Sequence, residues 1–161
     1  MTVISAGVLL YRRGALGREV LLVHPGGPFW ARKDDQAWSI PKGEAAEGED
    51  LAAAARREFA EEVGALPAGD LAPLGEFRQP GGKRVVAFAL EGDFDVTKLR
   101  SNVVEIEWPP HSGRRLAIPE IDRAAWFDLA TAARKIHKGQ RPILDAFDRN
   151  GPGLKVTSGA A

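Results

Sequence analysis

Three glutamates stand close enough along the chain to act together on one ligand. They are Glu58, Glu61 and Glu62, at spacings i, i+3 and i+4. An α-helix turns about 100° per residue, so these side chains project from one face and their negative charges repel. Hard divalent cations such as Mg²⁺ and Mn²⁺ take oxygen ligands and convert that repulsion into coordination. The spacing therefore indicates a metal site, with a solvated acidic helix face as the ordinary alternative.

The segment that carries the glutamates has the pattern of an amphipathic helix. A second, apolar stripe lies away from the acids and suits packing against a sheet: Ala52, Ala55, Phe59 and Val63. Asp50 is placed to cap the start of the helix, and Gly64 to end it. We therefore expect one helix with a buried side and an acidic side.

From Gly43 to Ala65 the sequence resembles the Nudix box. The pattern is a glycine, five residues, a glutamate, seven residues, Arg-Glu, an apolar residue, any residue, Glu-Glu, any residue, a glycine and an apolar residue. Every fixed polar and glycine position is present, and Ala65 is smaller than the aliphatic residue usual at the last position. The resemblance implies an α/β fold, the Nudix-type α/β/α sandwich with a mixed, curved β-sheet, over a single domain at residues 1–150.

The resemblance also implies roles for the residues at the matching positions. The implied metal ligands, for Mg²⁺ or alternatively Mn²⁺, are the carboxylates of Glu58, Glu61 and Glu62 and the backbone carbonyl of Gly43. Arg57 is included among the implied catalytic residues. With Glu49 as its structural partner, it would order the loop and the helix carboxylates rather than contact the substrate. An exposed helix arginine is the alternative for Arg57, because surface ion pairs are common and weak.

A metal site of this kind suits the cleavage of phosphoanhydrides. Metal ions neutralise phosphate oxygens and lower the pKa of a bound water, and a general base must lie within hydrogen-bond reach of that water. Glu58 and Glu120 are the two candidates for the base. Glu120 precedes the apolar run 124–127, so a loop that feeds a strand is expected to carry it, and a solvent-facing loop glutamate is the alternative.

Candidate substrate contacts surround the box. The run Trp38–Gly43 resembles the Trp-x-x-Pro-Lys-Gly pattern of Nudix enzymes that act on dinucleoside polyphosphates and on some nucleoside triphosphates, and Lys42 offers a cation to a phosphate. Trp30 is a candidate for stacking on a base, whereas Trp38 is either a stacking or a core residue. Arginine forks suit phosphate oxygens. The basic candidates for the rim of the site are Arg78, Arg114 and Arg115, considered with Lys83 and Arg84.

Composition limits the classes of partner. The chain has 161 residues, with 22 Lys and Arg against 22 Asp and Glu, so nothing favours bulk nucleic-acid or membrane binding. There is no cysteine, which excludes disulfides and thiolate chemistry and fits a cytoplasmic location. The three histidines are too scattered for a histidine metal site. No apolar run approaches about 20 residues, so no membrane span is expected. A homodimer remains possible.

The elements that must position these residues follow from periodicity and turn signals. Strands are expected at 3–11, 19–23, 74–78, 83–90, about 102–108 and 124–127, with helices over the box, at about 129–137 and at 142–148. A turn is expected at 12–18, loops at 25–35 and 109–119, and a mobile tail at 151–161. Trp108 and Trp126 are expected to pack beneath helices.

Three functions fit these observations. The first is a metal-dependent hydrolase of a nucleoside diphosphate linked to another group, with a dinucleoside polyphosphate or a nucleoside triphosphate as substrate. The second is removal of pyrophosphate from the 5′ end of RNA, against which the neutral charge argues because long polyanions select basic tracks. The third is a nucleotide-sensing module without catalysis, which is expected to lack some of the box carboxylates, whereas all of them are present.

Overall fold

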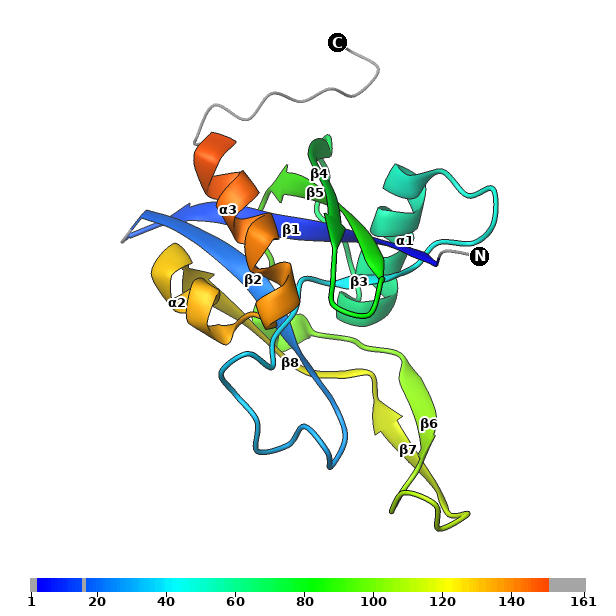
Figure 1. The fold of residues 1–161 in the computed structure, drawn as a ribbon. Helices are drawn as coiled ribbons and strands as arrows, with labels where there is room; N and C mark the ends of the chain where they lie inside the picture. The colour runs from blue at the N-terminus through cyan, green and yellow to red at the C-terminus, as the bar shows by residue number, and fades with distance from the viewer. Residues whose placement is uncertain (1–2, 16, 151–161) are drawn as a thin grey trace.

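The computed structural model describes residues 3–15 and 17–150, which form one mixed sheet with helices on both faces and a separate hairpin (Figure 1). The main sheet contains β1 (Ile4–Gly14), β2 (Gly17–Pro25), β3 (Lys42–Glu44), β4 (Ala72–Arg78), β5 (Arg84–Glu91) and β8 (Ile121–Asp128). The hairpin is β6 (Val103–Glu107) with β7 (Arg115–Pro119). The α-helices are α1 (Leu51–Val63), α2 (Leu129–Lys135) and α3 (Arg141–Asn150). The predicted tail, residues 151–161, lies outside the described residues.

The main sheet mixes parallel and antiparallel pairs. Its strand order is β4-β5-β1-β2-β8, and β3 pairs with β1 beside this path. β1 runs parallel to β5 over the whole stretch from Ile4 to Tyr11, whereas its pairs with β2 and β3 are antiparallel. The β2–β8 and β4–β5 pairs are also antiparallel. The predicted α/β fold with a mixed sheet is confirmed.

One edge of β1 is shared between two partners. Its C-terminal part, Tyr11–Gly14, pairs with β2, whereas its N-terminal part, Ser5–Gly7, pairs with β3. Ser39 forms a bridge to Val23, so the chain between β2 and α1 runs beside both β2 and β1. A Cβ added at Gly7 would lie 2.7 Å from the carbonyl oxygen of Pro41, so glycine permits this close approach. The divided pairing places residues 39–44 within the sheet.

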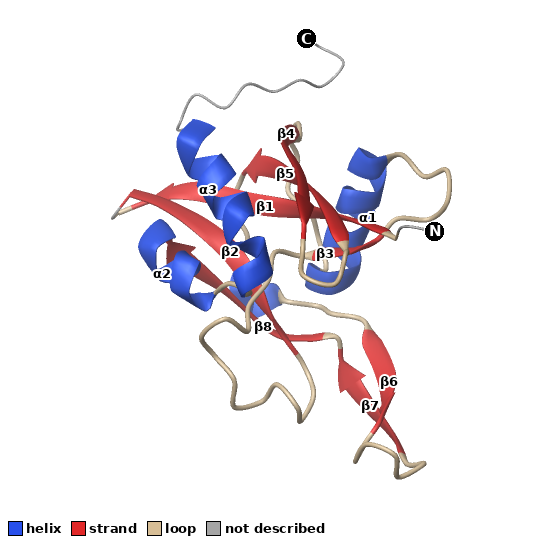
Figure 2. Cartoon of the chain, in the orientation of Figure 1, coloured by secondary structure: helices blue, strands red, loops and turns tan. Residues whose placement is uncertain are grey.

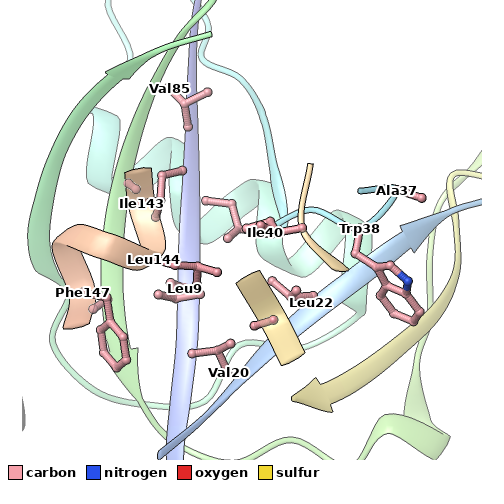
Figure 3. Close-up of a cluster of buried hydrophobic side chains, with 14 residues drawn as sticks. Leu9, Val20, Leu22, Ala37, Trp38, Ile40, Val85, Ile143, Leu144 and Phe147 are labelled. Atoms are coloured by element: carbon pink, nitrogen blue, oxygen red, sulfur yellow. The ribbon is translucent and has the colours of Figure 1, made fainter. Parts of the chain in front are cut away.

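Two apolar layers fix the helices on opposite faces of the sheet. Successive side chains of a strand point to opposite faces of the sheet. On one face of β1, Ala6, Val8 and Leu10 pack in the cluster that contains the buried face of α1. Leu9 joins the opposite cluster, where Val20 and Leu22 of β2 meet α2 and α3. Figure 3 shows this second cluster, with Ile143 and Phe147 of α3 close to Leu9. Figure 2 shows α2 and α3 on the side of the sheet away from α1, the predicted α/β/α order.

Helix α1 begins and ends as predicted. Asp50 accepts a hydrogen bond from the backbone N–H of Ala53 at 3.0 Å, and Gly64 follows the helix with φ of 116°. A residue with a side chain rarely adopts that positive φ, so glycine suits the end of the helix. Phe59 and Val63 are fully buried in the α1 cluster. The acidic face of α1 is thereby directed away from this cluster.

Replacing the cap residue tests the start of the box helix. Asp50→Ala is expected to lower the free energy of unfolding by about 1 kcal/mol, because it removes the acceptor for the Ala53 N–H. Asp50→Asn should cost far less, since asparagine caps about as well as aspartate. Urea denaturation followed by circular dichroism gives both values. Equal losses in the two variants would contradict the capping role.

Three sequence-based boundaries are wrong. Residues 115–119, expected within a loop, form β7 because they pair with β6 from Val103↔Pro119 to Glu107↔Arg115. The turn expected at 12–18 is shorter, since β1 extends to Gly14 and β2 begins at Gly17. β8 begins at Ile121, three residues before the predicted start. Trp108 follows β6 and joins neither apolar cluster, whereas Trp126 packs against the α1 cluster as expected.

Candidate active site

Two pockets adjoin at the place where residues 39–44 enter the sheet. The tryptophan pocket has a volume of about 370 Å³, and Trp30 and Trp38 are among the residues that line it. The carboxylate pocket, of about 360 Å³, is lined by five glutamates: Glu44, Glu58, Glu61, Glu62 and Glu120. Four residues line both pockets: Lys42, Glu62, Lys83 and Glu120. A recess that contains two tryptophans and an acidic recess therefore meet across two lysines and two glutamates.

The acidic face of α1 forms the floor of the carboxylate pocket. Glu58 and Glu62 are buried, with 8% and 6% of their surface exposed, whereas Glu61 is half-exposed. Carboxylates are seldom buried unless they are paired with other groups. The helix therefore places the three predicted metal ligands along one pocket, and their metal binding stays a prediction.

Arg57 connects the loop before α1 to the helix carboxylates. Its Nε and Nη2 donate to the two oxygens of Glu49, at 2.9 and 3.0 Å, in a fork that matches the carboxylate. Its Nη1 donates to Glu58 at 2.9 Å and to Glu61 at 3.2 Å. Nη2 also donates to the carbonyl of Glu44 at 3.1 Å. The Arg57 fork lowers the pKa of the Glu49 carboxyl to about 2, and these bonds raise the pKa of Arg57.

Burial acts in the opposite direction on the two enclosed glutamates. It raises the pKa of Glu62 to about 8, with a further contribution from the nearby Glu120 carboxylate. Burial also raises the pKa of Glu58, against the lowering effect of Arg57. Desolvation and neighbouring like charges both disfavour an ionised carboxylate. The pocket thus holds more acidic groups than its own cations offset, which is the environment that a divalent cation stabilises.

The backbone around Gly43 approaches the same carboxylates. A Cβ added at Gly43 would lie 2.0 Å from Oε2 of Glu58, so only glycine leaves this carboxylate in its place. The backbone N–H of the preceding residue, Lys42, donates to Oε1 of Glu62 at 3.1 Å. Strand β3 therefore lies directly against α1 at the two buried glutamates. Among residues 3–15 and 17–150, however, no three His, Cys, Asp or Glu side chains already surround one point as metal ligands.

Gly43→Ala tests this close approach. The added methyl group must displace the Glu58 carboxylate, so metal-dependent turnover is expected to fall about tenfold, as for other changes that misplace a metal ligand. Steady-state kinetics over a series of Mg²⁺ concentrations measures the loss. Gly48→Ala, at a glycine with open space around it but φ of 78°, controls for the general strain of adding a methyl group. Equal turnover in Gly43→Ala and the native chain would contradict the argument.

Glu120 lies between β7 and β8 and joins the site from a distant part of the sequence. Its backbone N–H donates to the carbonyl of Asn102 at 2.7 Å, and its carbonyl accepts from the N–H of Gly26 at 3.0 Å. A Cβ at Gly26 would lie 2.0 Å from the carbonyl oxygen of Pro119, so this contact also requires glycine. The half-buried Glu120 is placed beside Glu62, where it lines both pockets.

The predicted substrate contacts divide into two groups. Lys42 and Trp30 line the tryptophan pocket, as does Lys83. The three predicted arginines, Arg78, Arg114 and Arg115, are exposed and line neither of the two pockets. Arg114 and Arg115 belong to the β6–β7 hairpin, which extends away from the main sheet (Figure 1). A phosphate role for these arginines stays a prediction that the pocket geometry does not support.

Sequence reasoning did not identify three polar residues of the tryptophan pocket: Gln79, His137 and Gln140. Gln140 is 2% exposed and accepts from the backbone N–H of Ile40 at 3.0 Å, so it fixes the chain just before Lys42. Gln79 lies in the β4–β5 turn, and His137 follows α2. Nothing in their local sequence distinguishes them from surface residues. Trp38 is 4% exposed and belongs to the core, which decides between its two interpretations.

This α/β fold, with an acidic box helix under a mixed sheet, defines the class of protein. A family model of the NUDIX domain matches residues 1–147. The chain belongs to the Nudix family, whose members are generally enzymes that act on nucleotides and typically use divalent metals.

Three relatives illustrate the likeness. Nudix hydrolase 7 of Arabidopsis thaliana is 30% identical over 116 residues, which are 67% of this chain and 39% of that protein. An RNA pyrophosphohydrolase of Caulobacter vibrioides is 52% identical over 50 residues, 28% of this chain and 29% of that protein. The chain therefore spans well under half the length of these curated relatives. The solved structure of an Ap4A hydrolase of C. elegans, in a binary complex, matches this fold with a TM-score of 0.63 at 24% identity. The match covers 92% of this chain and 98% of the Ap4A hydrolase chain. This last likeness concerns the fold alone.

Proposed function

We propose that this chain is a divalent-metal-dependent hydrolase of a phosphoanhydride bond in a nucleoside diphosphate linked to another group, with a dinucleoside polyphosphate or a nucleoside triphosphate as substrate. The observation that carries the proposal is the shared boundary of the two pockets, formed by Lys42, Glu62, Lys83 and Glu120. A nucleotide has an apolar, aromatic end and an anionic end. The tryptophan pocket and the carboxylate pocket offer matching environments at that boundary.

The residues present fit a divalent metal ion. Glu58, Glu61 and Glu62 provide hard carboxylate oxygens on one helix face, and the Gly43 backbone lies against Glu58. With the Gly43 carbonyl they would hold Mg²⁺, or Mn²⁺ in its place. The ion, when bound, neutralises phosphate oxygens and lowers the pKa of a coordinated water. This division of labour leaves substrate placement and proton transfer to the protein side chains.

Lys42 and Lys83 are placed to bind the phosphates where the two pockets meet. Trp30 gives the apolar wall against which a nucleoside packs. Glu120 is the favoured general base, because Oε1 of Glu58 already accepts from Arg57 at 2.9 Å. The Glu120 carboxylate would take the proton from the attacking water. The water oxygen would then add to phosphorus and displace the leaving phosphate.

A second candidate function is the removal of pyrophosphate from the 5′ end of RNA. It is favoured by the 52% identity to an RNA pyrophosphohydrolase over 50 residues. The equal numbers of acidic and basic residues argue against it, since no basic track is expected to bind a long polyanion. A sensing role without catalysis is less well supported, because Glu58, Glu61 and Glu62 are all present and line the carboxylate pocket.

One experiment separates these functions. The purified chain is incubated with Mg²⁺ and, separately, with nucleoside triphosphates, dinucleoside polyphosphates, nucleotide sugars and 5′-triphosphorylated RNA, in water labelled with ¹⁸O. Metal-dependent cleavage of a small nucleotide, with label in one product, is expected, and the labelled product identifies the attacked phosphorus. Preferred cleavage of RNA would move the assignment to the second candidate. Hydrolysis of none of these substrates would reject both.

The remaining proposals concern the location, the oligomeric state and the domain organisation of the protein. No helix within residues 3–15 and 17–150 is both long and apolar enough to cross a membrane. A cytoplasmic location and a homodimer stay predictions from the sequence, as does the single domain over residues 1–150.

A further inference from the structure

His24 is completely buried and bonded through both nitrogens of its ring. Its Nδ1 lies 2.8 Å from Oδ1 of Asp122, and its Nε2 lies 2.6 Å from the carbonyl oxygen of Lys33. A carbonyl oxygen only accepts hydrogen bonds, and so does an ionised carboxylate. With Asp122 ionised, each ring nitrogen must carry a hydrogen in this geometry, which makes His24 an imidazolium cation. The Nε of Arg123 lies 3.6 Å from the same Asp122 oxygen.

An irregularity in the sheet directs Asp122 toward this histidine. His24 is paired with Arg123, whereas the next residue, Pro25, is paired with Ile121. Asp122 is therefore the extra residue of a β-bulge, and bulges re-aim side chains next to functional sites. Without the bulge, the side chain of residue 122 would follow the regular alternation along β8. The bulge thus supplies the counter-charge of His24.

The Lys33 carbonyl belongs to the loop that carries Trp30. The backbone N–H of Lys33 donates to the carbonyl of Trp30 at 2.9 Å, and its Nζ lies 3.7 Å from the centre of the Phe29 ring. Trp30 in turn lines the tryptophan pocket. The bond from His24 to Lys33 therefore ties this turn, and with it the pocket wall, to β2.

Other charged groups next to His24 belong to the same arrangement. Trp38 packs edge-on to the His24 ring, at 5.2 Å between ring centres, and donates through Nε1 to Asp34 at 2.8 Å. Lys135 of α2 pairs with that Asp34 carboxylate. From β8, Asp122 and Arg123 are the charged residues near the ring. These bonds join the loop to β2, β8 and α2, and the imidazolium stands at their centre.

We propose that His24 is a positioning residue, which as a buried imidazolium holds the loop at residues 26–37 so that Trp30 forms the wall of the substrate pocket. The substrate part of this inference rests on the proposed function, whereas the protonation and the loop order do not. Loss of either bond should loosen the loop and weaken nucleotide binding, and it should leave the carboxylate chemistry largely intact. The expected kinetic mark is a higher KM with little change in kcat.

The protonation state can be measured directly in the full chain. Nitrogen-15 NMR of the histidine rings at neutral pH, with His24 assigned by comparison with His24→Gln, is expected to show hydrogen on both ring nitrogens. In Asp122→Asn the amide can donate to Nδ1, so that nitrogen is expected to lose its hydrogen while the bond to Lys33 remains. A native His24 ring with one bare nitrogen would overturn the proposal.

Hydrogen exchange and kinetics test the effect on the loop. In Asp122→Ala the amides of residues 26–37 should exchange at least tenfold faster, whereas in Asp122→Asn their protection should persist. For Asp122→Ala the KM for the nucleotide found to be cleaved should rise about tenfold with kcat within about twofold. Arg32→Gln, an exposed change in the same loop, should alter neither quantity. Unchanged exchange in Asp122→Ala would overturn the positioning role.

The two levels of the proposal fail separately. If no nucleotide is cleaved, the NMR and exchange results still decide whether His24 holds the loop as a cation. If cleavage occurs and the loop loosens while KM stays at the native value, the loop does not position Trp30 for substrate, and that part of the proposal is wrong. A fall in kcat at constant KM would also reject it, since it would place His24 within the catalytic step.

Discussion

Glu62→Gln is expected to reduce metal-dependent turnover by about a thousandfold or more. The glutamate is 6% exposed and lies on the boundary of both pockets, so its charge faces the proposed metal and the phosphates. Loss of a charged metal ligand removes several kcal/mol of transition-state stabilisation, and each 1.4 kcal/mol corresponds to about tenfold in rate. Single-turnover measurements at saturating Mg²⁺ isolate the chemical step.

The fold should tolerate this change. Glutamine has nearly the shape of glutamate, and its amide oxygen can still accept from the Lys42 N–H, which is 3.1 Å from the glutamate oxygen. Because burial already disfavours the charged form of Glu62, a neutral amide at this position should leave the free energy of unfolding in the absence of metal the same or raise it. Glu47→Gln removes an exposed charge from the loop before α1 and should leave turnover intact. Undiminished turnover in Glu62→Gln would refute the catalytic assignment.

Arg57→Lys is expected to lower kcat/KM by about a hundredfold and to raise the Mg²⁺ concentration required for half-maximal activity. Lysine keeps the charge but cannot make the paired contacts of the fork to Glu49 while also bonding Glu58. Residues that orient metal ligands typically contribute 10- to 100-fold to metal affinity or activity. Mg²⁺ titrations of the rate give both constants.

The neighbouring arginine provides a matched control. Arg56 lies on the same helix and donates to the carbonyl of Gly69 at 2.7 Å, away from the carboxylate pocket. Arg56→Lys should therefore leave the Mg²⁺ dependence unchanged. If both lysine variants behaved like the native chain, the fork of Arg57 would be an ordinary surface contact. Equal losses in both would indicate a general effect on α1 instead.

The sequence predicted best what one element carries by itself. The glutamates, their apolar counter-stripe and the caps Asp50 and Gly64 all belong to α1, so helical periodicity alone places them correctly. β7 was missed because Arg114 precedes it, Arg115 begins it and Pro119 ends it, and because four of its five residues are exposed. A strand with so little burial lacks the alternating pattern that identifies strands in a sequence.

The pocket residues show a different limit. Gln79, His137 and Gln140 come from the β4–β5 turn and from the chain after α2, so their meeting depends on strand order. Local patterns carry no information about that order. The role of His24 was hidden for the same reason, because its partner Asp122 follows 98 positions later. Between segments, the sequence suggested Glu120 as a candidate but did not indicate the pocket glutamines or the partner of His24.

The divided edge of β1 has a consequence for how such enzymes diversify. Residues 39–44 enter the sheet where β1 leaves β2, so Gly43 is part of the sheet. Trp30, in contrast, belongs to the connection at residues 26–37, which contains no strand. If the proposed function holds, changes in that connection are expected to alter substrate choice more than metal binding. Under the proposed function, the residues for the reaction and those for the choice of substrate thus belong to different parts of the fold.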